Sequence, residues 1–141
     1  MPRTKRKPVP ADTAIRRIAS GSAYESLIGY CRAVVADGWV HVSGTVGNDH
    51  ATMTTPESVV EQCELALGHI RKALDQAGAT FADVVRVHYI LPDRNDFQAC
   101  WPLLRDAFGE NPPAATMIEA GLIDPAMKIE IEVTARLPET A

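Results

Sequence analysis

The clearest pattern in this chain is a strict alternation of apolar and polar residues over 128–134, near its C-terminal end. One side carries Ile129, Ile131 and Val133, and the other carries Lys128, Glu130, Glu132 and Thr134. A period of two is typical of a strand that buries one face. We therefore predict a strand over Lys128–Arg136. Its polar face, with two carboxylates, can meet solvent, a polar pocket or a subunit interface.

Further segments have the composition or alternation of strands. They are Ile15–Ala19, Tyr30–Ala36, Trp39–Thr45, Val84–Leu91 and Ala114–Ala120. Asp37-Gly38 separates the second of these from the third, and it predicts a hairpin turn because both residues tolerate positive φ. The stretches Gly21–Gly29 and Val46–Thr54 are predicted to be loops.

Helical spacing of apolar residues predicts two helices. In the first, Thr55 is the expected N-cap, Pro56 the first helical residue and Gly78 the stop. Its apolar stripe is Val59, Cys63, Ala66, Leu67, Ile70, Ala73, Leu74 and Ala77. The second is expected to start at Asp93–Asp96 and to bury Phe97, Cys100, Trp101, Leu104 and Phe108. Pro102 fits only if this helix begins near Phe97, where the missing N–H belongs to the first turn.

This order of elements predicts an α+β fold, in which a mixed six-stranded sheet carries two helices on one face. The other face must then meet water or another subunit. The chain of 141 residues is long enough for one domain with its own core, which we assign to residues 14–141. Residues 1–13, with Arg3, Lys5, Arg6 and Lys7 among prolines, are expected to be a flexible basic tail.

Composition and charge narrow the class of protein. The formal net charge of -4 argues against a nucleic-acid-binding surface, which is normally basic. Cys31, Cys63 and Cys100 are widely spaced within apolar patterns, so we expect free thiols and a cytoplasmic location. No apolar run approaches the ~20 residues that span a bilayer, so no membrane partner is expected. No His or Cys spacing indicates a metal site, and no cofactor is expected.

Four segments carry a resemblance to a known family. They read "GYCRAV" at 29–34, "VHVSGTVG" at 40–47, "GATFADVVRVHYIL" at 78–91, and "NPPAATMIEA" followed by "MKIEIEVTA" between 111 and 135. In this order they resemble the RidA family, also called YjgF or L-PSP, over nearly the whole chain. The resemblance implies a chorismate-mutase-like fold and a homotrimer, in which the open sheet faces form a central barrel and ligand clefts lie between subunits.

The chain departs from the family at one informative place. The family signature usually reads Pro-Ala-Arg-Ser where this chain has Pro113-Ala114-Ala115-Thr116. The family's imine deaminases use that arginine to hold the substrate carboxylate, so the resemblance places this chain in an arginine-lacking subgroup. With Ala115 and Met117 at these positions, that wall of the expected pocket is apolar. Arg32, on the same strand face as Tyr30, can supply a cation from another direction, or can form a surface or interface ion pair instead.

The resemblance also assigns residues to the cleft. Glu130 matches the glutamate that holds and activates a water near the imine carbon, and Tyr30 matches the tyrosine that closes over the substrate. Ser43 and Gly44 match a strand end that borders the cleft, where glycine permits close approach of a ligand. Each residue also has a purely structural alternative. Glu130 can be an interface carboxylate that is hydrogen-bonded within the protein, and Tyr30 can be a core or interface aromatic residue. Ser43 and Gly44 can be an ordinary strand end before a loop.

Three functions follow from these residues. The first is a divergent hydrolase or deaminase that uses Glu130 and a water on a small imine, enamine or amide-type metabolite. The second is a non-catalytic trimer that binds a small molecule. The third, a ribonuclease or translation inhibitor, conflicts with the acidic charge and with the absence of paired catalytic histidines. Ordinary 2-imino acid deamination is expected to be weak or absent.

Overall fold

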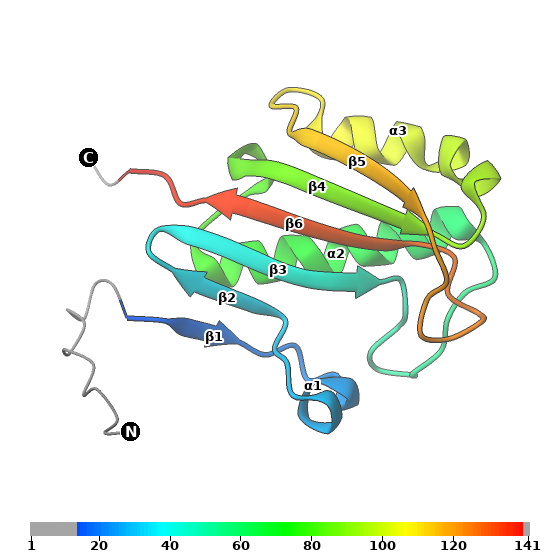
Figure 1. Ribbon diagram of the computed structural model, residues 1–141, viewed down its shortest axis with the longest axis horizontal. Coiled ribbons are helices and arrows are strands. Elements are labelled where there is room, and N and C mark those ends of the chain that lie inside the picture. The colour runs from blue at the N-terminus through cyan, green and yellow to red at the C-terminus, as the bar shows by residue number, and fades with distance from the viewer. Residues whose placement is uncertain (1–13, 140–141) are drawn as a thin grey trace, which may run out of the picture.

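Six strands form one sheet in the computed structural model, which describes residues 14–139. Figure 1 shows the strand order β1-β2-β3-β6-β4-β5. Only β4 and β5 run parallel, so the sheet is mixed, as predicted. The strands are β1 (Arg16–Ile18), β2 (Ala33–Ala36), β3 (Trp39–Val46), β4 (Val84–Leu91), β5 (Ala114–Glu119) and β6 (Glu130–Arg136). The predicted basic tail, residues 1–13, lies outside the described residues.

Two long helices, α2 (Val59–Ala77) and α3 (Phe97–Phe108), cover one face of the sheet. The predicted apolar stripe of α2 from Cys63 to Ala77 is buried. The helix begins later than predicted, because the side chain of Ser58, and not of Thr55, accepts a hydrogen bond from the N–H of Glu61. A 3₁₀ turn, η3 (Arg94–Asp96), leads into α3, so Pro102 falls early in that helix, as its missing N–H requires.

The core lies between these helices and the sheet. Ile129, Ile131 and Val133 are almost completely buried, which confirms the face predicted from the alternation. Trp101 was predicted to be buried with the apolar side of α3, and that prediction is wrong. Its side chain is 49% exposed. The opposite face of the sheet, toward the viewer in Figure 1, has no helix from residues 14–139 over it and exposes Trp39 and Ile118.

The segment between β1 and β2 was predicted to be a loop, but it contains a short helix, α1 (Ala23–Ile28). Its start has the sequence Ser22-Ala23-Tyr24-Glu25, in which the carboxylate of Glu25 accepts a hydrogen bond from the N–H of Ser22. This is the capping-box spacing, a signal of helix initiation that the prediction overlooked. The helix ends at Gly29, whose φ of 95° is left-handed. It matters here because it lies beside the cavity described below.

The turn between β2 and β3 is the predicted hairpin. Asp37 and Gly38 have φ of 53° and 80°, the two positive values that this tight turn requires.

The segment before β6 is held by Gln62, a completely buried polar residue on α2. Its amide donates to the carbonyls of Pro56 and Ala126 and accepts from the N–H of Lys128. These bonds tie the segment before β6 to α2 and so position Glu130.

Candidate active site

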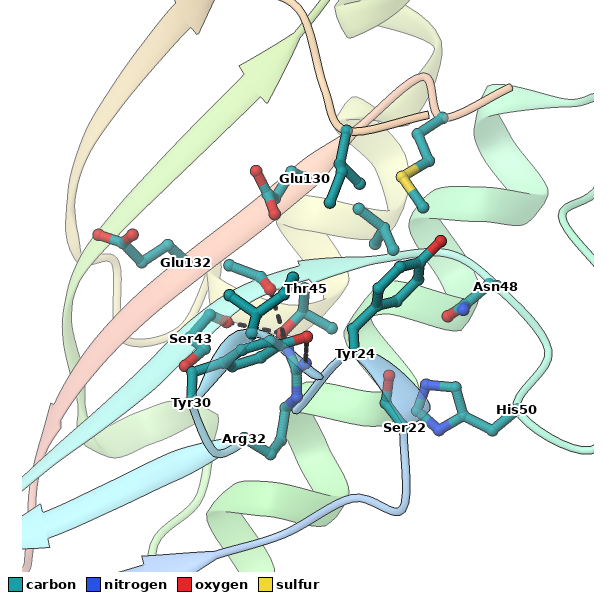
Figure 2. Close-up of a pocket in the computed structure, with 15 residues that line it drawn as sticks. Ser22, Tyr24, Tyr30, Arg32, Ser43, Thr45, Asn48, His50, Glu130 and Glu132 are labelled. Carbon is teal, nitrogen blue, oxygen red and sulfur yellow. Dashed lines mark hydrogen bonds between the residues drawn. The ribbon is translucent and has the colours of Figure 1, made fainter. Parts of the chain in front are cut away.

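A cavity of about 380 Å³ lies where the loops after β3 and β5 meet the start of β6. Five of the residues predicted for the ligand cleft line it. They are Tyr30, Arg32, Ser43, Gly44 and Glu130. In Figure 2, Glu130 comes from one side of β3, and Tyr30 and Arg32 come from the other side. The structure therefore brings together residues that are up to 100 positions apart in the sequence.

Apolar and polar side chains that were not predicted complete the wall. They are Ser22, Tyr24, Ile28, Thr45, Val46, Asn48, His50, Ile123, Met127 and Glu132. Several of them belong to α1 or to the loops after β3 and β5, whose positions depend on tertiary contacts. The capping box at Ser22 was the one sequence signal that could have placed Tyr24 and Ile28 near a site.

A β-bulge shapes the floor of the cavity. Val42 pairs with Val133 and Thr45 pairs with Ile131, so two residues of β3, Ser43 and Gly44, share the space opposite Glu132. Such a bulge bends its strand and redirects the neighbouring side chains. It brings Gly44 against Glu130, where a Cβ on Gly44 would lie 2.6 Å from Oε1 of Glu130. Because glycine has no Cβ, position 44 leaves space for the Glu130 carboxylate.

Replacing Gly44 with alanine is expected to displace the Glu130 carboxylate without unfolding the protein. Gly44 does not have a positive φ, and the atoms that the new Cβ meets belong to the end of a side chain. We expect any turnover that depends on Glu130 to fall about tenfold or more, because displacing a reacting group by about 1 Å is costly. Gly68→Ala on α2, where an added Cβ meets nothing within 4 Å, is the matched control. Equal activity of the two variants would show that the position of Glu130 is unimportant.

Glu130 is a half-buried carboxylate without a fixed partner. No donor within residues 14–139 hydrogen-bonds to it, so its oxygens are free to accept from a water or a ligand. Burial raises the pKa of Glu130 above its usual value of 4.5, and the negative charge of Glu132 raises it further. The positive charge of Arg32 opposes these two effects without overcoming them. A carboxylate with a raised pKa is a stronger base once ionised.

Glu132 has a different environment, although it lies two residues away on the same face. Its Oε1 lies 3.0 Å from Nδ1 of His88, which is opposite it on β4. Its side chain is 48% exposed, so this pair is weak and screened by solvent. Glu132 therefore has a partner outside the cavity and acts on Glu130 only through its charge.

Arg32 is buried at 6% exposure, and it forms no ion pair with a carboxylate of residues 14–139. A single chain therefore does not contain the surface ion pair that was one alternative, and an ion pair at a subunit interface stays a prediction. Its Nη1 donates to the carbonyl of Gly44 (2.9 Å) and to Oγ1 of Thr45 (2.8 Å), and its Nη2 lies 3.4 Å from the Tyr30 hydroxyl. A guanidinium has five N–H donors, so three are engaged. Arg32 thus holds the bulge and Tyr30 in place and contributes a positive charge.

Two hydroxyl groups of the cavity wall, those of Tyr30 and Ser43, differ in what they can offer a ligand. Tyr30 accepts from Arg32, which leaves its own O–H free to donate into the cavity. The hydroxyl of Ser43 donates to the carbonyl of Cys31 at 2.7 Å, so its proton is engaged. Tyr30 is therefore the better hydrogen-bond donor to a bound molecule, and Ser43 fixes the segment before β2.

Ala115 and Met117 do not line this cavity within one subunit. They lie on β5, the edge strand, opposite Val87 and Tyr89 of β4. Because partners in a ladder point the same way, both lie on the face that carries the helices, and Met117 packs against the core. The open face of β5 carries Ala114, Thr116 and Ile118 instead. The subunit that contains this cavity therefore contributes neither residue to it.

Residues 14–139 are the part of the chain that the structure describes. That part of the chain has no group of three or more His, Cys, Asp or Glu side chains placed to hold a metal ion. It also contains no helix long and apolar enough to cross a membrane.

Comparison with known proteins adds to this geometry. The sequence model of the family described as endoribonuclease L-PSP matches residues 20–137. The 2-iminobutanoate/2-iminopropanoate deaminase of Capra hircus is 33% identical over 123 residues, which is 86% of this chain and 90% of the relative. Among solved structures, a YjgF-family protein from Mycobacterium tuberculosis is similar with a TM-score of 0.80 and 36% identity, over 88% of this chain and 100% of that one. A YjgF-family protein from Neisseria meningitidis has a TM-score of 0.74 and 26% identity, over 91% of this chain and 98% of that one.

The sheet, the two covering helices and the match over residues 20–137 define a chorismate-mutase-like α+β protein. The chain belongs to the endoribonuclease L-PSP family, also called the YjgF or RidA family, as its four sequence segments predicted.

Proposed function

We propose that this protein is a hydrolase of the deaminase type, which acts on a small imine, enamine or amide-type metabolite in the cavity beside Glu130. The observation that carries the proposal is the state of Glu130: half-buried, with a raised pKa and with no donor from the described residues on its carboxylate. Active sites are where such perturbed carboxylates collect. The name of the relatives, 2-iminobutanoate/2-iminopropanoate deaminase, supports the same reaction class.

For an imine, the reaction is a balanced hydrolysis. Glu130 removes a proton from a water, the hydroxide adds to the imine carbon, and Glu130 returns that proton to the nitrogen to give a carbinolamine. The carbinolamine hydroxyl then loses its proton to the nitrogen as the C–N bond breaks, so that the carbonyl forms and ammonia leaves. Tyr30 can donate its O–H to the substrate, and its ring helps to exclude solvent. Arg32 places Tyr30 and favours negative charge that develops during water addition. Ile28, Ile123 and Met127 give the wall an apolar part that suits a substrate with a hydrocarbon side chain.

The second candidate is a non-catalytic trimer that binds a small molecule. The observation that favours it is the absence of the family's carboxylate-binding arginine, because Ala115 offers no charge to a carboxylate. A screen separates the two functions: imines, enamines and small amides are tested for turnover, with ammonia release as the signal. Hydrolysis of at least one compound supports the first function. Saturable binding without any turnover supports the second. A ribonuclease remains a weaker candidate, because the chain has a net charge of -4.

We also propose that the protein is a homotrimer with the cavity at the subunit boundary. Two helices cover one sheet face only, and the open face exposes Trp39 and Ile118, an apolar area that a monomer does not favour. Met117 does not add to this area, because it lies on the face that the helices cover. Sedimentation equilibrium at micromolar concentration is expected to give three times the 15.3 kDa chain mass. A stable monomer would contradict the trimer.

A further inference from the structure

A second cavity, of about 250 Å³, adjoins the candidate active site but has a different character. It lies between α2, the end of β1 and the loop after β3. Its charged and imidazole side chains are Arg32, Asp49, His50, His69 and Lys72. The space is several times the ~30 Å³ that a water occupies in the liquid, so it can hold a small ion together with ordered waters.

The charge of this wall is mainly positive. Arg32 and Lys72 are cationic at neutral pH, and Asp49 is the one carboxylate among the lining residues. Oδ1 of Asp49 accepts hydrogen bonds from the N–H groups of Ala51 and Thr52, which lower its pKa and direct that oxygen at its own loop. Asp49 therefore offsets only part of the positive charge.

Arg32 is a buried cation whose charge acts on two nearby carboxylates, Glu25 and Glu130, without an ion pair to either of them. It is 6% exposed, and it makes no ion pair with any carboxylate in residues 14–139. Its Nε is a buried donor that has no hydrogen-bond partner in the described chain. Buried charges in folded proteins are usually paired, because removing an unpaired charge from water is costly. An anion in the adjoining cavity would supply a negatively charged partner in direct contact with Arg32.

Two histidines, His50 and His69, form one edge of this wall. Their rings are stacked, with centroids 3.9 Å apart and an interplanar angle of 2°. Nε2 of His69 lies 2.7 Å from the carbonyl of Asn48, and because a carbonyl only accepts, this nitrogen carries a proton. Burial lowers the pKa of His50, and the charges of His69, Arg32 and Lys72 lower it further, while Glu25 opposes them. A bound anion would favour the protonated form of His50.

We propose that this cavity binds a small oxyanion, namely a phosphate group, free or in a monoester. A phosphate carries up to two charges, which matches the two cations and the two titratable rings that converge here. Arg32 lines both cavities and bonds to Tyr30 and Gly44, so the oxyanion site borders the candidate active site through one shared side chain. Nothing in this inference requires that the neighbouring cavity be catalytic.

Isothermal titration with inorganic phosphate, with glycerol 2-phosphate and with acetate tests the proposal on the full-length protein. We expect both phosphates to bind and acetate to bind at least tenfold more weakly. Lys72→Gln, on the exposed side of α2, is expected to weaken phosphate binding about tenfold or more, since a charged hydrogen bond is lost. Arg71→Gln, the next residue, removes the same charge but faces Phe81, and is expected to change the affinity less than about twofold.

NMR titration of His50 gives a second readout, which a purely structural role of Lys72 would not produce. Saturating phosphate is expected to raise the pKa of His50, because a bound anion stabilises the protonated ring. The proposal is overturned if no saturable phosphate binding occurs below about 10 mM. It is also overturned if Lys72→Gln binds as tightly as the unmodified protein, or if phosphate leaves the His50 titration unchanged.

Discussion

Hydrolysis of 2-iminobutanoate and 2-iminopropanoate is expected to be slow, with kcat/KM about 10- to 150-fold below that of a family member that carries the clamping arginine. That range corresponds to the roughly 1.5–3 kcal/mol of one hydrogen bond to a charged group. Alanine at position 115 has no donor, whereas a guanidinium gives a carboxylate two hydrogen bonds and a full charge. Arg32 is not an equivalent substitute, because three of its five donors are engaged by Gly44, Thr45 and Tyr30.

Steady-state ammonia release with both substrates, side by side with an arginine-bearing relative, measures this difference. Ala115→Arg alone is not expected to restore the rate, since Met117 lies on the same face of β5 and restricts the new side chain. A rate close to that of the relative in the unmodified protein would contradict the argument and would identify Arg32 as the substitute clamp.

The elements that repeat a local pattern were the ones that the sequence could predict. The alternation in Lys128–Arg136 and the stripe on α2 each describe one buried face, and burial is the term that dominates folding. Val84–Leu91 has the predicted bounds because a 3₁₀ turn (η2, Phe81–Asp83) and η3 flank it closely. The five cleft residues also meet in one cavity, although their family roles stay predictions.

The features that depend on pairing between distant segments could not be predicted in this way. The bulge at Ser43 and Gly44 exists only because β3 is matched against β6, and its effect on Glu130 requires both strands. The parallel register between β4 and β5 decides on which face of the sheet Ala115 lies. The alternation of residues along β5 alone does not reveal that face. The stack of His50 on His69 joins a loop to α2 and has no counterpart in the local sequence.

The chemistry assigned to Glu130 has a definite dependence on pH. A base acts in its ionised form, so the rate should rise with pH through the pKa of Glu130. Burial and Glu132 raise this pKa above 4.5, so the acidic limb of kcat/KM should lie above the usual range of a glutamate. Glu132→Gln removes one of the two causes and should move that limb to lower pH. Its loss of the exposed pair with His88 should change the rate less than about fivefold.

The most direct measurement of the central claim is turnover by Glu130→Gln on any compound that the screen identifies. Glutamine keeps the volume of the side chain in the space left by Gly44, but it cannot remove a proton from water. We predict a fall of about 10²- to 10⁴-fold in kcat, the usual contribution of a general base, with an unchanged sedimentation profile. Glu132→Gln, measured beside it, is predicted to remain active. Full activity of Glu130→Gln would contradict the account and would move the function to binding or to another site.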